Sequence, residues 1–179
     1  RPLISLSLAL DYLIGGPNPL TFHISNWLYQ TVASCLMFLV AGQIGEHFRP
    51  NEKTLNRSLA LSAGVIFSVY PLHCEVVNWV IARVDSIALV FCLLSFWLYL
   101  KSAHESAQRT NSLHYKLSLF AFVLGLMSKE MAVTLPPTLL LIHLLSTTTA
   151  DTKSTKGRLL SSLNQTKPFW LILFAYLLF

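Results

Sequence analysis

The chain has 179 residues, of which 54% are hydrophobic and only 12% are charged, and its mean hydropathy is +0.56. Soluble domains carry about 25% charged residues, so the composition excludes an ordinary soluble domain and predicts an integral membrane protein. The net charge of +5 does not indicate nucleic-acid binding, because the cations collect in loops between apolar runs. The chain starts at Arg1 rather than Met and ends inside an apolar run, so we expect a fragment of a larger protein.

The N-terminal segment 3–14 can be interpreted in two ways. Its first residues alternate between apolar and polar types, which is typical of a strand. As a helix, it would place Leu3, Leu6, Leu10, Leu13 and Ile14 on one face. The segment is too short to span a bilayer, and lipid does not tolerate an open strand edge. We therefore predict a helix that lies at the membrane interface.

Six apolar runs follow, and each is predicted to form a membrane-spanning helix, which makes the fold class all-α. A span needs about 20 residues, and Pro136-Pro137 should kink the fifth run or begin its regular part. No soluble domain or internal repeat is visible, so the chain is treated as a single membrane domain over 1–179. The predicted spans lie near 24–44, 59–78, 81–100, 115–130, 131–147 and 168–179.

The positive charges are unevenly distributed between the two sides that these spans define. If every run crosses, the loops 45–58, 101–116 and 146–167 share one face. They carry ten of the Lys and Arg residues, whereas the opposite face carries Arg1, Arg83 and Lys129. The positive-inside rule then places the three loops in the cytoplasm. The opposite face is predicted to lie in the periplasm or in the lumen of the endoplasmic reticulum.

Six ionisable residues are predicted at one depth on this outer face. Counting about 20 residues per span places all of them in the outer turns of their helices. Charge at membrane depth is costly and seldom occurs without a partner or a function. We therefore predict a shared, water-accessible cavity. The six residues are His73, Glu75, Arg83, Asp85, Lys129 and Glu130.

The charges in this cluster have a functional and a structural interpretation. The cations Arg83 and Lys129, together with Arg1, are candidates to bind an anionic head group such as a phosphate. The catalytic candidates are the other four residues, of which His73 or a carboxylate could orient or deprotonate a hydroxyl. The structural alternative is a set of ion pairs that pin helix ends. Such pairs would form across helices, for instance between Arg83 and Glu75 or Glu130. The charges could also extend to the membrane interface, as long charged side chains do.

No metal site and no cofactor are predicted. His73, Glu75 and Asp85 could supply ligands, but one histidine with scattered carboxylates is weak support for a metal centre. The three cysteines, Cys35, Cys74 and Cys92, lie in apolar surroundings without CxxC or Cys/His spacing. They are predicted to be buried thiols.

Three ordered blocks resemble the TMTC-type membrane proteins, which carry tetratricopeptide repeats and have many bacterial relatives. The first block holds Arg1-Pro2-Leu3, Asp11-Tyr12, Gly16, Pro19, Phe22-His23 and Asn26. The second, in 70–85, resembles the family's His-Pro-x-His-x-Glu-Ala and Gly-Arg-x-Asp, with Tyr70 and Ala82 as departures. The third is Ser128-Lys129-Glu130 with the residues up to Pro136.

This family is similar to GT-C glycosyltransferases, and the resemblance implies both a fold and a function. The implied enzyme moves a sugar, of mannose type, from a polyprenyl or dolichyl phosphate carrier to a protein or glycan acceptor on the outer face. The catalytic acid of such enzymes lies in the first outer loop, which would precede Arg1, and the repeats would follow the membrane domain. An ion-coupled transporter and a non-catalytic anchor for a repeat domain remain the alternatives. A bacterial inner membrane is preferred to the endoplasmic reticulum.

Overall fold

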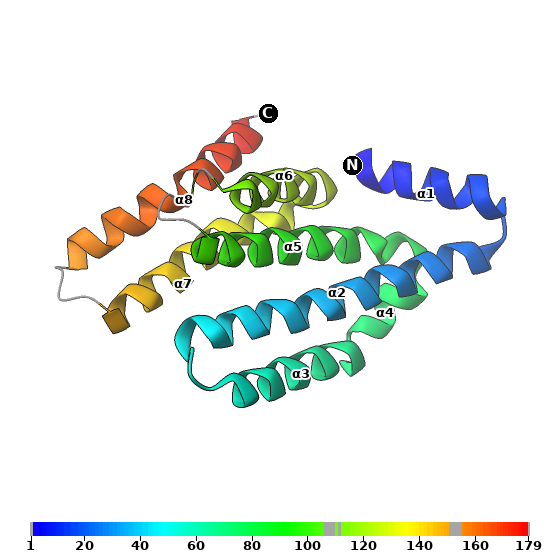
Figure 1. The fold of residues 1–179 in the computed structure, drawn as a ribbon. Helices are drawn as coiled ribbons and strands as arrows, with labels where there is room; N and C mark the ends of the chain where they lie inside the picture. The colour runs from blue at the N-terminus through cyan, green and yellow to red at the C-terminus, as the bar shows by residue number, and fades with distance from the viewer. Residues whose placement is uncertain (1, 106–109, 111, 151–154, 179) are drawn as a thin grey trace.

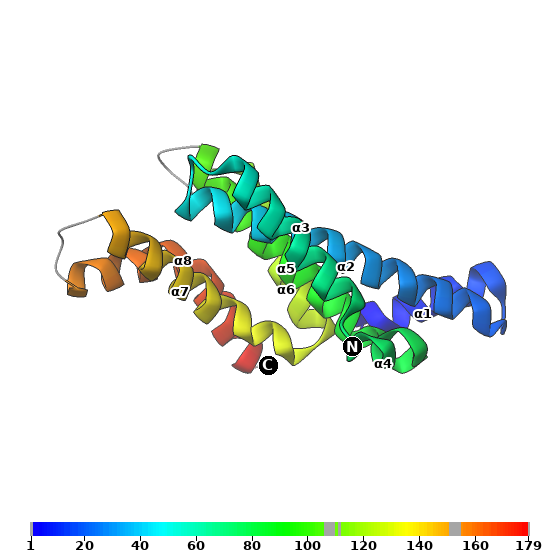
Figure 2. The same ribbon diagram turned by 90° about the horizontal axis from the view of Figure 1, so that it is seen from below.

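The computed structural model describes residues 2–105, 110, 112–150 and 155–178, and within them the fold is all-α, as predicted. Figures 1 and 2 show the helices running roughly side by side, with α7 and α8 diverging from the rest. The described residues form eight α-helices. They are α1 Pro2–Gly15, α2 Pro19–Phe48, α3 Lys53–Val69, α4 His73–Asn78, α5 Arg83–Glu105, α6 Leu113–Ser128, α7 Leu135–Ala150 and α8 Thr155–Leu178, with 3₁₀ turns η1 Val80–Ala82 and η3 Glu130–Thr134.

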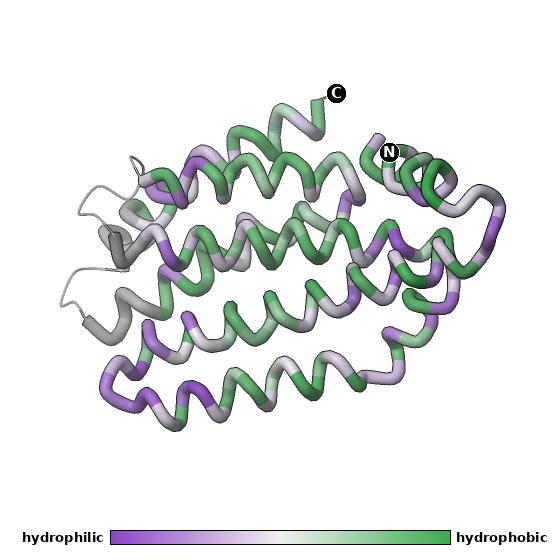
Figure 3. The backbone as a smooth tube through the Cα atoms, turned by 45° about the vertical axis from the view of Figure 1, so that its right-hand side comes forward, coloured by the Kyte–Doolittle hydropathy of each residue, from purple (hydrophilic) through white to green (hydrophobic). Residues whose placement is uncertain are grey.

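Among the residues that the structure describes, two helices are long and apolar enough to cross a bilayer by themselves. They lie at Pro19–Phe48 and Val80–Ser102, and shorter apolar helices lie at Pro2–Gly15, Leu113–Ser128 and Glu130–Leu145. Figure 3 shows the hydrophobic residues along the middle of the helices and hydrophilic residues at the α2–α3 turn and near α4. The structure and composition therefore indicate a membrane protein with two candidate spans, and six spans stay a prediction.

The helix α1 confirms the choice of a helix over a strand for the first segment. The residues that it buries are Ile4, Ser7 and Asp11, which recur at helical spacing on one face. The predicted apolar face points outward instead, with Leu6, Leu10, Leu13 and Ile14 exposed. Exposing these apolar side chains to water would be unfavourable, but exposing them to lipid is not, because the lipid tails are apolar as well. The position of α1 at an interface stays a prediction.

The boundaries of two predicted elements are corrected by the structure. The predicted second span, 59–78, is broken because α3 ends at Val69 and Tyr70 is extended before Pro71. The predicted loop 146–167 is largely helical, since α7 continues to Ala150 and α8 starts at Thr155 rather than at Pro168. Pro136 and Pro137 lie in the first turn of α7, where they begin the regular helix.

A polar contact explains why α8 begins before its apolar run. His143 on α7 bonds through Nδ1 to Ser162 Oγ at 3.0 Å and through Nε2 to Gln165 Oε1 at 2.6 Å. The Tyr115 hydroxyl donates to the Gln165 carbonyl at 2.9 Å. These bonds hold the first half of α8 against α6 and α7, so the helix does not depend on hydrophobic residues there.

The helices pack closely where small residues meet. A Cβ atom added to Gly64 on α3 would lie 3.2 Å from Phe38 Cβ, and one added to Gly45 on α2 would lie 2.9 Å from Asn56 Oδ1. Small residues let helix backbones approach, which drives association in lipid. Because α2 also packs along α5, it links the α3 hairpin to the rest of the bundle.

The buried core is formed by α2, α5, α6, η3, the first half of α7 and the second half of α8. The aromatic rings of Tyr99, Tyr115, Phe122 and Phe169 pack against one another in it. Cys35 and Cys74 are exposed and Cys92 is partly buried, so the prediction of buried thiols is wrong for the first two. Cys35 lies in a groove between α2 and α3, and Cys74 lies on α4, in which none of the described residues is buried.

Two reciprocal hydrogen bonds join α5 to α6. Ser95 Oγ donates to the Ser118 carbonyl, and Ser118 Oγ donates to the Ser95 carbonyl, each at 2.7 Å.

We expect Ser95→Ala to lower the free energy of unfolding by about 0.6 kcal/mol, the average for interhelical hydrogen bonds in membranes. Thermal melting in detergent measures the loss, with Ser62→Ala on exposed α3 surface as control. A loss no larger than that of the control would contradict this assignment.

The predicted sidedness of the loops agrees with the arrangement of the helices. The α2–α3 turn and the ends of α5, α6, α7 and α8 that adjoin the other two loops lie at the same end of the molecule (Figures 1 and 2). The segment from α4 to the start of α5 lies at the other end. Which compartment faces each end stays a prediction.

Candidate functional site

A pocket of about 290 Å³ lies at the end of the bundle opposite the long loops. It brings together three of the six predicted charged residues, Glu75, Asp85 and Lys129. The remaining wall is formed by Trp79 and by small or apolar residues of α4, η1 and α5. These are Val76, Ile81, Ala82 and Val84.

An ion pair crosses this pocket from α6 to α5. Lys129, the residue that follows α6, donates from Nζ to Asp85 Oδ1, and the two side chains are 23% and 39% exposed. Asp85 lies in the first turn of α5, where the helix dipole favours a negative charge. The pair is open enough for an incoming anion to compete with Asp85 for the ammonium group.

The opposite wall of the pocket belongs to α4, which carries Glu75 and ends just before Trp79. Both side chains are exposed, and the Trp79 indole is 59% accessible. None of the residues described in α4 or η1 is buried. This wall therefore has no core of its own and depends on contacts with its neighbours for its position.

Arg83 lies behind the pocket, in a buried polar cluster that joins three helices. Its side chain is 0% exposed and forms an ion pair with Asp11 Oδ2 of α1 at 2.5 Å. It also donates to Ser7 Oγ at 3.0 Å, to Asn26 Oδ1 at 3.0 Å and to the Phe22 carbonyl at 2.9 Å. The guanidinium lies over the Phe22 ring, 5.7 Å from its centroid.

These contacts correct the predicted pairing of Arg83 with Glu75 or Glu130. The guanidinium turns toward α1 and α2, because Asp11 and Asn26 offer buried acceptors there. A group without exposed surface and with four hydrogen bonds cannot meet a phosphate unless this cluster opens. Of the predicted phosphate-binding cations, Lys129 is the one that lines the pocket, and Arg1 lies outside the described residues.

The other two candidates lie apart from the pocket lining. His73, which begins α4, packs against the Phe67 ring with centroids 4.3 Å apart and against the Tyr70 ring at 5.9 Å. Glu130 is exposed at the start of η3. Within the described ranges, no three His, Cys, Asp or Glu side chains are placed to hold a metal ion.

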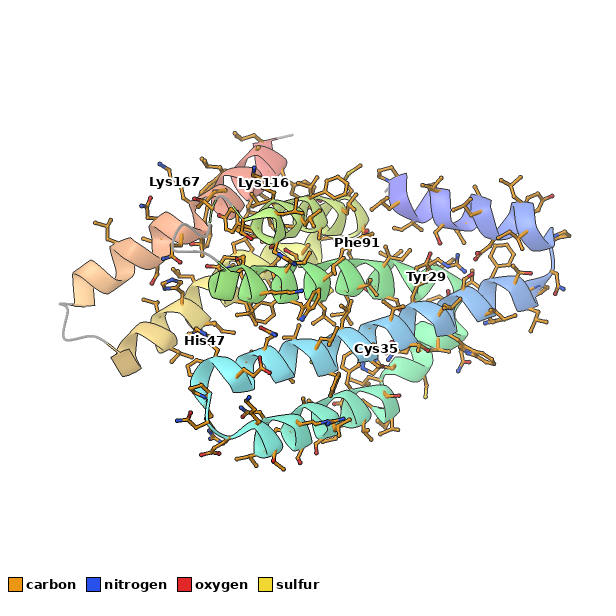
Figure 4. The ribbon with its side chains drawn as sticks, in the orientation of Figure 1. Tyr29, Cys35, His47, Phe91, Lys116 and Lys167 are labelled. Carbon is orange, nitrogen blue, oxygen red and sulfur yellow. The ribbon has the colours of Figure 1, made fainter. Side chains whose placement is uncertain are left out.

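Sequence reasoning missed Asp11, Ser7 and Asn26 as members of the polar cluster. Asp11 also accepts a hydrogen bond from Ser25 Oγ at 2.6 Å, and Ser7 bonds to the Tyr29 hydroxyl at 3.0 Å (Tyr29 is labelled in Figure 4). The signal was available in Asp11, a lone carboxylate in an apolar segment. Such a charge requires a partner, and Arg83 is that partner.

A larger cavity, of about 980 Å³, lies on the α7–α8 hairpin and contains none of the predicted site residues. Its lining is mostly apolar, with Lys167 and Asn164 as polar members; Lys167 is labelled in Figure 4. A large volume alone does not identify a functional site. The smaller pocket contains the charged side chains that could bind an anion or transfer a proton. We therefore take the pocket of Glu75, Asp85 and Lys129 as the candidate functional site.

The described residues thus form an all-α fold with two candidate membrane spans and a charged pocket at one end, features that suggest a membrane protein. Comparison with curated proteins identifies the relatives. The chain is homologous to the TMTC protein O-mannosyl-transferases, as the sequence blocks predicted.

Three relatives show the extent of the match. The chain is 35% identical over 136 residues to protein O-mannosyl-transferase Tmtc1 and 37% identical over 139 residues to Tmtc2, both of Drosophila melanogaster. It is 32% identical over 142 residues to human TMTC4. Each match covers 75% of this chain but only 14% of the fly proteins and 19% of the human protein. No protein-family model and no solved structure matches the chain.

Proposed function

We propose that this chain is part of a membrane glycosyltransferase that moves mannose from a polyprenyl or dolichyl phosphate carrier to a protein or glycan acceptor. The support is twofold. The homologues are named as protein O-mannosyl-transferases, and the chain forms a pocket whose charges suit a phosphate-linked sugar. In this proposal the transfer takes place on the periplasmic or luminal face, which is the face that the positive-inside rule predicts for the pocket. The membrane is the bacterial inner membrane or, as the alternative, that of the endoplasmic reticulum.

The observation that carries this proposal is the open ion pair of Lys129 with Asp85. An ammonium group binds a phosphate by charge-assisted hydrogen bonds, and here Asp85 neutralises it in the absence of ligand. When the carrier's phosphate replaces Asp85 at Lys129, the carboxylate is released into the pocket. Asp85 and Glu75 are then the groups that can orient or deprotonate an acceptor hydroxyl. The exposed Trp79 ring offers an apolar face for the sugar.

The experiment is a binding measurement with polyprenyl-phosphate mannose on the purified chain in nanodiscs. We expect Lys129→Gln to weaken binding by about ten- to a hundredfold, since a hydrogen bond to a charged group contributes about 1.5–3 kcal/mol. Lys116→Gln is the matched control, because Lys116 is an exposed lysine at the start of α6 (Figure 4). Wild-type affinity in a folded Lys129→Gln protein would overturn the proposal.

Asp85→Asn separates this function from a purely structural ion pair. The substitution removes the competitor for Lys129, so carrier binding should stay the same or tighten by a few-fold. If the pair only ties α5 to the end of α6, the Lys129 and Asp85 variants should lose similar amounts of stability in detergent melting and bind the carrier alike.

A further inference from the structure

We propose that Asn26 is a positioning residue that fixes the α4 wall of the candidate site, and that the buried Arg83–Asp11 pair holds Asn26 in the required orientation. The importance of this wall for a ligand rests on the proposed function. The positioning itself rests on geometry alone. The contacts run from α1 through α5 and α2 to the segment that carries Glu75 and Trp79.

The first step is the contact between Asn26 and the end of α4. Asn26 is fully buried on α2, and its Nδ2 donates to the carbonyls of Val77 at 3.2 Å and of Val76 and Trp79 at 3.4 Å. The last carbonyls of a helix have no partner within the helix. The two N–H groups of one amide are therefore shared among three carbonyls at the point where α4 ends and η1 begins.

The second step is the weakness of α4 without this contact. The helix has six residues and no side-chain hydrogen bond at its N-cap. So short a helix is not stable by itself, because the cost of nucleation is not recovered. None of its described residues is buried, and the ring contact of His73 with Phe67 lies at the opposite end of the helix, so packing gives the C-terminal end of α4 little support. The amide of Asn26 is thus a principal tie between the α4 wall and the bundle.

The third step is the orientation of the amide. An asparagine side chain can rotate by 180°, which exchanges its donor and its acceptor. Arg83 Nε donates to Asn26 Oδ1 at 3.0 Å, so the rotated amide would place two donors against each other. Arg83 in turn is fixed by the carboxylate of Asp11. The charge on α1 therefore determines that the NH₂ group of Asn26 points toward α4.

The same guanidinium also fixes the other side of the pocket. Arg83 is the first residue of α5, and Asp85 follows in the same helical turn. The positions of Glu75 on one wall and of Asp85 on the other thus both depend on the single buried cation Arg83. A displacement of Arg83 should therefore move both carboxylates.

The test uses Asn26→Asp in the whole chain. The aspartate keeps an acceptor for Arg83 but loses the donor to the α4 carbonyls. We expect the protein to fold, with backbone amides of residues 76–82 exchanging with deuterium about tenfold faster, since a hydrogen bond contributes up to about one factor of ten. Amides of residues 119–127 in α6 should exchange as in the wild type. Asn164→Asp, at an exposed position on α8, is the matched control.

Cys74 provides a second measurement, because it is exposed on α4 beside Glu75. In a Cys35→Ser background, the rate at which a maleimide alkylates Cys74 should change in Asn26→Asp and not in Asn164→Asp. If Asn26→Asp does not fold, Arg83→Lys replaces it. That variant keeps a cation near Asp11 but loses the Nε bond to Asn26, so it should show the same local increase in exchange.

The outcomes separate this inference from the proposed function. Faster exchange in 76–82 with weaker binding of polyprenyl-phosphate mannose supports both. Faster exchange with unchanged carrier binding supports the positioning role and contradicts the carrier pocket. Unchanged exchange and unchanged Cys74 alkylation in a folded variant would overturn the positioning role, whatever the carrier affinity.

Discussion

Replacing Asp11 with alanine is expected to lower the free energy of unfolding by about 3–5 kcal/mol, because it leaves the buried charge of Arg83 without its counter-ion. Arg83 has no exposed surface through which water could replace the carboxylate. The variant should also lose the bond from Ser25 to Asp11. Thermal melting in detergent, together with the yield of folded protein, measures the effect.

The control for this prediction is a pair of further variants. Glu52→Ala removes an exposed carboxylate and should leave the melting temperature almost unchanged. The double variant Asp11→Leu with Arg83→Met removes both charges, and it should be more stable than Asp11→Ala, since apolar residues of similar volume can replace a buried pair. An Asp11→Ala protein that melts like the wild type would show that Arg83 finds another partner.

Replacing Phe169 with alanine is expected to lower the free energy of unfolding by about 3 kcal/mol or more. The ring is fully buried and meets those of Phe122, Tyr99 and Tyr115, with centroids 5.4, 5.6 and 6.0 Å away. In lipid the cost comes from lost packing contacts, because no hydrophobic drive acts between helices. The second half of α8 should separate from α5 and α6, which hydrogen exchange in 169–177 would detect.

Two variants on the same helix test whether packing causes this loss. Leu171→Ala removes an exposed side chain and should have little effect. Phe169→Leu keeps most of the volume and should fall between the wild type and Phe169→Ala. Equal losses for Phe169→Ala and Leu171→Ala would contradict the assignment of this ring to the core.

The sequence predicted the all-α class and the order of the apolar helices better than the ends of those helices. Apolar runs mark segments that lipid can surround, so 24–44 falls inside α2, and 81–100 covers the end of η1 and most of α5. Hydropathy does not report helices held by polar contacts, which is why the first half of α8 was predicted as a loop. The bonds of His143 to Ser162 and Gln165 join residues on two different helices, 19 and 22 positions apart, so the hydropathy of either segment does not reveal them.

The location of the candidate site could be predicted from the sequence, but the partner of each charged residue could not. Depth counting put the charged residues in the outer turns of their helices, and the pocket contains Glu75, Asp85 and Lys129. Pairing depends on how each helix is rotated about its axis. For Arg83 this rotation favours acceptors on α1 and α2 over the nearby carboxylates Glu75 and Glu130. No local pattern in the sequence carries that information.

The separation of Asp11 and Arg83 along the chain sets an order of events during biosynthesis. The two residues are 72 positions apart, and ribosomes add about 5–20 residues per second. Asp11 therefore waits roughly 4–14 seconds for its counter-ion, whereas Ser25, 14 positions away, is available early. During this interval the carboxylate has to stay in contact with water, so α1 can take its final place only after α5 has been made. The helix α1 therefore leaves the ribosome before α5 but reaches its final position only after α5.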